Sequence, residues 1–278
     1  MSEEPEHPEP AVRFESTETE PRFVAAYNVA IASQAAFEAT LQDFGNLRIP
    51  GNDRERESLR RISLYLGTLF GELHAASTQL SFMEMPRAQY VLNRQLIEYH
   101  ARNRWFIEHK EIAVNELDRL PKAVHIEVTN NPGAFDEPAR IRIAENYAEW
   151  AKEHPDLDAL KHSVPGPTDM VKLSFDDADD MFWYYGHPSV IVHGKTHGIQ
   201  DVLARRPDGT LERSPNSLGL NRVAEMHRAT GFALRYGILL AVNFDLDESR
   251  LLDVQEKFDS ALRAEGLAPE LVTVKRYL

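Results

Sequence analysis

The chain has 278 residues, of which 42% are hydrophobic and 27% charged, a composition typical of one large or two small soluble globular domains. It has no cysteine, which excludes disulfides, a thiol nucleophile and thiolate metal ligands and fits a cytoplasmic protein. The net charge of −13 argues against broad nucleic-acid binding, and no apolar run is long enough to span a membrane.

Residues 1–20 are predicted to form a disordered acidic tail, because they are rich in glutamate and proline and poor in aromatics. They also lack the basic and then apolar run of a signal peptide. From Pro21, which suits a first helical position, one apolar face predicts a helix to about residue 45. After a turn, Asp53 is a capping residue for a second helix that runs to about residue 80.

A third helix, the longest, is predicted from Pro86 to about Pro121, and a fourth follows the loop at 130–136 and ends near residue 153. Residues 154–170 are predicted to be irregular because they contain three prolines and a glycine. The remaining elements are expected to be a helix after the acidic residues at 176–180, a tight turn at 206–209 within a small hairpin, a helix from about residue 216 to 242, and a final helix at 249–265. With roughly seven helices and no repeat, the fold class is all-α, a single helical bundle over residues 21–278.

Residues 181–197 combine an apolar, aromatic composition with a regular polar pattern. Tyr185, Ser189, His193 and His197 follow one another at four-residue steps, so a helix would place their side chains along one face. Polar groups inside an apolar helix need partners, because an unpaired buried one costs roughly 1–3 kcal/mol. Such a stripe of polar residues either makes the packing of the core specific or forms part of a binding or catalytic site.

A second polar stripe lies on the long helix, where Arg94, Glu98 and Arg102 are spaced by four residues and His109 follows on nearly the same face. If the two stripes face each other, the arginines would hold an anion, Glu98 would orient a histidine, and His193 would transfer a proton. The simpler interpretation is an exposed Arg–Glu pair, which contributes only tenths of a kcal/mol.

Other kinds of active site fit the sequence less well. Ser189 lacks the glycine-rich turn that surrounds the nucleophile of serine hydrolases, so that class is disfavoured. His193 and His197 have a spacing typical of metal ligands, with His187 nearby, but Gly194 stands where the zincin motif requires glutamate. We therefore predict no metal and no other cofactor.

Together the two stripes resemble a family of uncharacterised bacterial all-helical proteins, a domain of unknown function. The resemblance rests on the Arg-x3-Glu pattern of Arg94 and Glu98 and the Tyr-x3-Ser-x3-His-Gly pattern of residues 185–194, and it covers about residues 55–245. It implies an all-α fold with a polar site at Arg94, Glu98 and the serine and histidine of the second pattern. It implies no established activity.

Two functions from different classes remain. The first is binding of a small polar or anionic ligand at the Arg/Glu/Ser/His site, with Arg102, His109, Tyr185 and His197 as further ligand-binding residues. The alternative is a metal-independent ribonuclease of the prokaryotic defence type, because Arg102 and His109 fit the Arg-x(4–6)-His spacing of the nucleotide-binding helical bundles shared by higher eukaryotes and prokaryotes. A histidine base and an arginine that holds phosphate suffice for RNA cleavage. We favour ligand binding, and we also expect a homodimer through an apolar helix face.

Overall fold

The computed structural model describes residues 21–51, 53–159, 164–172, 203–205, 210–213 and 222–267, together with residues 181, 185, 186 and 188. Over these ranges the fold is all-helical apart from one short hairpin, as the sequence predicts. None of the helices in the described part of the chain has the length and apolar character needed to cross a membrane. The predicted acidic tail, residues 1–20, lies outside the described residues.

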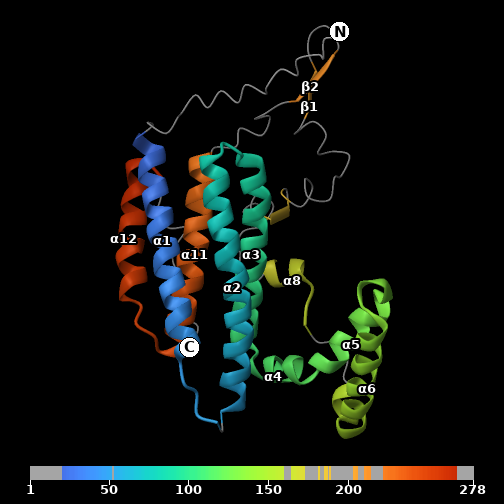
Figure 1. Cartoon of the computed structure of the whole chain (residues 1–278). Coiled ribbons are helices and arrows are strands. Elements are labelled where there is room, and N and C mark those ends of the chain that lie inside the picture. The colour runs from blue at the N-terminus through green and yellow to red at the C-terminus, as the bar shows by residue number, and fades with distance from the viewer. Residues whose placement is uncertain are drawn as a thin grey trace, which may run out of the picture.

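Five long helices form the bundle (Figure 1): α1 (Pro21–Asn46), α2 (Arg54–Phe82), α3 (Pro86–Glu108), α11 (Arg222–Phe244) and α12 (Ser249–Ala264). Helices α1, α2 and α12 begin and end within about two residues of the predicted positions. Helix α11 ends near the predicted residue 242, and its predicted start at about residue 216 lies outside the described residues. Asp53 caps α2 as expected, since its carboxylate accepts a hydrogen bond from the backbone N–H of Arg56 at 3.0 Å.

The core of the bundle lies around α11, which packs against α1, α2, α3 and α12. Its sequence is apolar on almost every side, as expected of a helix surrounded by others. Tyr236 is completely buried, with its ring 5.5 Å from that of Phe37 of α1 and 4.8 Å from that of Phe70 of α2. Large aromatic side chains that interlock in this way contribute most of the stabilisation of such a core.

The single long helix predicted from Pro86 to Pro121 is wrong. The chain leaves helical geometry at His109, whose φ and ψ are −132° and 61°, and again at Arg119. Pro121 therefore lies in the first turn of a new helix, where its missing N–H costs nothing. The resulting elements are α4 (Lys110–Asp118) and α5 (Leu120–Asn130).

Beyond α5 the chain forms a short 3-10 turn (Pro132–Ala134), then α6 (Glu137–Glu153), α7 (Pro155–Ala159) and α8 (Pro167–Lys172). The last two correct the prediction that residues 154–170 are irregular, because in both cases a proline at the start of the segment begins a short helix. Helix α8 returns to the bundle and packs on α3. The predicted small hairpin is present as β1 (Leu203–Arg205) paired antiparallel with β2 (Leu211–Arg213).

Candidate functional site

Three polar side chains predicted to form a site meet beside α3. The guanidinium of Arg94 lies 2.8 Å from Glu98 Oε1 through Nη2, and the same Nη2 donates to the hydroxyl oxygen of Tyr185 at 3.2 Å. The Tyr185 hydroxyl in turn donates to Glu98 Oε1 at 2.6 Å. The three groups thus form a closed triangle between two segments about ninety residues apart in the sequence.

Both members of the ion pair are largely withdrawn from water, with side chains of Arg94 and Glu98 each 12% exposed. The guanidinium also lies over the Tyr185 ring, 4.7 Å from its centroid, which adds a cation–π contact. Glu98 Oε2 accepts a further hydrogen bond from Gln95 Nε2 at 2.7 Å. Burial, and then the hydrogen bond to Glu98, raise the pKa of Tyr185, so its hydroxyl remains a donor at neutral pH.

Local sequence explains how these groups come together. The four-residue spacing places Arg94 and Glu98 on one face of α3, one turn apart. Helix α8 packs on α3, and its two buried apolar side chains, Met170 and Val171, belong to the main apolar cluster of the core. Tyr185 is itself 3% exposed and joins the same apolar cluster, so its ring is fixed while its hydroxyl reaches the ion pair.

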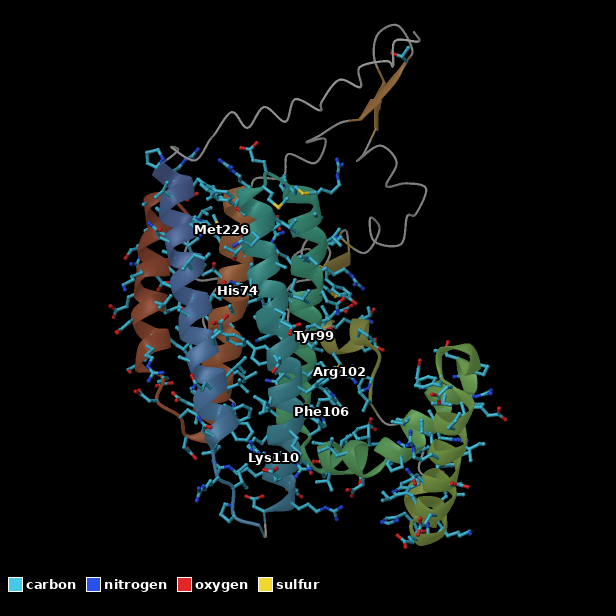
Figure 2. All side chains as sticks on the ribbon, in the orientation of Figure 1. His74, Tyr99, Arg102, Phe106, Lys110 and Met226 are labelled. Carbon is cyan, nitrogen blue, oxygen red and sulfur yellow. The ribbon has the colours of Figure 1, made fainter. Side chains whose placement is uncertain are left out.

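The structure does not bring the other residues of the α3 stripe into this triangle. Arg102 is exposed and its guanidinium lies 6.0 Å from the ring of Phe106, while Figure 2 shows both following Tyr99 along α3 toward Lys110. His109 ends the helix, and its ring stacks on Trp105 at 4.5 Å with Nδ1 2.9 Å from the Trp105 carbonyl oxygen. Fifteen residues at about 1.5 Å each separate it from Arg94, which is about 22 Å along the helix.

The remaining predicted site residues, Ser189, His193 and His197, lie outside the described residues, as does His187. No group of three or more histidine, aspartate or glutamate side chains in the described ranges could hold a metal ion. Two other histidines with an arginine a few residues before them are buried structural groups. His100 packs against Phe232 at 5.6 Å, and His227 Nε2 lies 3.0 Å from Glu265 Oε1.

The sequence interpretation missed a buried polar network between α2, α3 and α11. The Asn93 amide donates to Glu225 Oε2 and to the Glu225 carbonyl oxygen, each at 2.9 Å, and its Oδ1 accepts from Ser77 Oγ at 2.8 Å. Arg228 Nη1 donates to both carboxylate oxygens of Glu225, at 2.7 and 2.9 Å. Burial raises the pKa of Glu225, and the contacts with Arg228 and Asn93 oppose that rise.

Other polar side chains in the same core have no hydrogen-bond partner. Both ring nitrogens of His74 and both amide atoms of Gln89 are unpaired, although each side chain is 0% exposed. Figure 2 shows His74 inside the bundle, below Met226 of α11. Burial lowers the pKa of His74 to about 4, so the ring is neutral at neutral pH. The sequence does contain a signal for these buried polar residues, because Gln89, Asn93 and His100 occupy core positions of α3 at the spacing of one helix face.

Comparison with family models, with curated proteins and with solved structures finds no match to this chain. The functional argument therefore rests on the geometry of the triangle formed by Arg94, Glu98 and Tyr185.

Proposed function

We propose that the protein binds a small polar or anionic ligand at the site where Arg94, Glu98 and Tyr185 meet. The observation that supports this proposal is an ion pair with both partners only 12% exposed, tied to a tyrosine from a distant segment. A guanidinium recognises carboxylate and phosphate oxygens through its fixed N–H groups, while Glu98 and the Tyr185 hydroxyl supply an acceptor and a donor beside it.

The energetics of the pair support a role beyond packing. Removing two charges from water costs several kcal/mol per ion, and apolar residues of similar volume often serve a purely structural position as well or better. Charged groups retained at such a cost are more frequent at functional sites, although structural ion pairs also occur. An experiment must therefore distinguish ligand binding at this ion pair from a role in packing alone.

The test measures the shift in melting temperature with inorganic phosphate and citrate as probes. At about a hundred times its dissociation constant, a bound ligand adds about 2.7 kcal/mol of stability. For a chain of this size that corresponds to a shift of roughly 5–10 °C. Arg94→Gln is expected to abolish the shift, because it removes the charge that holds the anion.

Helix α3 itself supplies a matched control. Arg104 and Glu108 form a second pair with the same four-residue spacing, at 3.0 Å and with side chains 19% and 28% exposed. Arg104→Gln is expected to leave the anion-induced shift intact. The proposal fails if neither probe stabilises the protein, or if Arg94→Gln and Arg104→Gln respond alike.

An apolar double variant, Arg94→Met with Glu98→Leu, distinguishes the two roles further. A site for a ligand predicts a stable protein that no longer responds to the probes. Incubation of wild type and Arg94→Gln with labelled RNA tests the ribonuclease alternative in parallel. Cleavage by the wild type that Arg94→Gln loses would favour that activity over simple binding.

A further inference from the structure

Helices α5 and α6 form a hairpin that stands apart from the five-helix bundle. Figure 1 shows the two helices side by side, connected to the bundle through α4. They pack on each other, and none of the 17 residues of α6 is buried. An isolated helix of this length is marginal in water, because most helical stability in proteins comes from tertiary packing.

The face of α6 that meets α5 is held by specific contacts. The rings of His125 and Tyr147 stack at 4.3 Å, and the Tyr147 hydroxyl donates to Asp158 Oδ1 at 3.0 Å. Lys122 of α5 pairs with the same carboxylate at 3.1 Å. These contacts fix the hairpin and determine which side of α6 faces outward.

The outward side of α6 carries an exposed apolar residue followed by two small ones. Ile141 is 53% exposed, and Ala144 and Ala148 follow it at the spacing of one helix face. Small side chains at these positions allow a second helix to approach closely. Across the hairpin, Leu120 and Ile126 of α5 are also exposed, at 55% and 48%.

The charges of α6 are divided between its two halves. Between its terminal turns, which carry Glu137 and Lys152, the helix has Arg140 and Arg142 in the first half and Glu145 and Glu149 at and beyond the middle, and the last four are exposed. Within the described part of the chain, none of the ion pairs involves these four side chains. If a second copy of the helix packed antiparallel, the arginines of each copy would lie near the glutamates of the other. In a parallel pair, like charges would lie next to each other.

We propose that α6 is a homodimer contact that pairs antiparallel with α6 of a second copy of this chain. A two-fold axis beside Ala144 and Glu145 brings Arg142 and Glu149 of the partner subunit together on one edge of the contact, because residues seven apart share a helix face, and it places Ile141 opposite Ala148 of the partner subunit. The contact is isologous, so each unlike pair occurs twice. A helix of this length spans about 25 Å, and an interface built on it belongs to the small and weak class.

Sedimentation velocity over a range of micromolar concentrations tests the proposal. The wild type is expected to be a concentration-dependent dimer. Two charge reversals, Arg140→Glu with Arg142→Glu and Glu145→Arg with Glu149→Arg, are each expected to weaken self-association about a hundredfold, because like charges across an interface cost several kcal/mol. All four side chains are exposed and take no part in the contacts of Tyr147 that hold the hairpin, so neither reversal is expected to unfold it.

The decisive measurement mixes the two reversed proteins. In the mixture, an α6 with acidic residues at all four positions meets one with basic residues at all four, so a heterodimer at least as tight as the wild-type dimer is expected. Lys257→Glu with Arg263→Glu, exposed on α12, makes the same change in net charge as the arginine reversal and is expected to leave the dimer intact. A monomeric wild type, a dimer that the α12 control weakens equally, or a failure of the mixture to associate would overturn the proposal.

Discussion

Replacing His74 by leucine should make the protein more resistant to mild acid. The ring is fully buried between α2 and its neighbours, neither nitrogen has a hydrogen-bond partner, and burial lowers its pKa to about 4. In the unfolded chain the same ring has a pKa near 6.5. Between these two values the unfolded state binds a proton that the folded state does not, so the free energy of unfolding falls as the pH falls through this window.

The size of the effect follows from the two pKa values. At about 1.4 kcal/mol for each pH unit, the full window is worth about 3 kcal/mol, and the part between about pH 6.5 and pH 5 is worth about 2 kcal/mol. His74→Leu removes this proton-linked loss while it roughly preserves volume, so at pH 7 its stability should lie within about 1.5 kcal/mol of wild type. His100→Phe is expected to behave similarly, because burial, Arg235 and Arg104 lower the pKa of His100 to about 3.

Urea unfolding at pH 7 and at pH 5 measures the change for wild type, His74→Leu and a control, His154→Gln, which lies at the end of α6. The wild type and the control should lose stability between the two pH values by about 2 kcal/mol more than His74→Leu does. If all three proteins lose the same free energy of unfolding between pH 7 and pH 5, then folding does not lower the pKa of His74, and the inference from its burial is refuted.

Two further predictions concern the packing of α11. Gly237→Ala should cost about 1–3 kcal/mol, because the new Cβ would lie 2.8 Å from Cδ2 of the fully buried Leu251. In the same helix, the Cβ of Gly231→Ala would meet no atom closer than 3.6 Å, so this substitution should raise the free energy of unfolding by up to about 1 kcal/mol. Equal effects of the two substitutions in denaturant unfolding would contradict this comparison. Asn93→Ala should cost about 3 kcal/mol, because it leaves the buried carboxylate of Glu225 without one of its donors. A measured loss below about 1 kcal/mol would show that the network relaxes around the substitution.

The sequence predicts the helices of the bundle well, because their boundaries carry signals that act locally. Pro21 and Asp53 begin α1 and α2, and Pro86 begins α3, at the residues expected. The break at His109 carries no such signal, since neither glycine nor proline lies there and apolar residues continue on both sides. At the break the His109 ring stacks on Trp105, a contact that residue spacing does not reveal.

For the candidate site, the sequence finds the residues that share a helix but not the path of the segment that meets them. The four-residue spacing is sufficient to pair Arg94 with Glu98, whereas the contact of Tyr185 with that pair joins segments about ninety residues apart, which spacing along one helix does not reveal. Buried polar residues such as Asn93 were missed for a different reason. A search for apolar periodicity passes over polar residues that occupy the same helix face.

The position of α11 at the centre of the bundle has a consequence for biosynthesis. Its apolar surface covers α1, α2 and α3, yet more than a hundred residues of chain separate α11 from the end of α3. At about 5–20 residues per second, the ribosome needs roughly 6–20 s to supply that helix after α3 is made. During this interval the nascent helices expose the side chains that α11 later covers, so the growing polypeptide is expected to depend on chaperones that shield apolar surface.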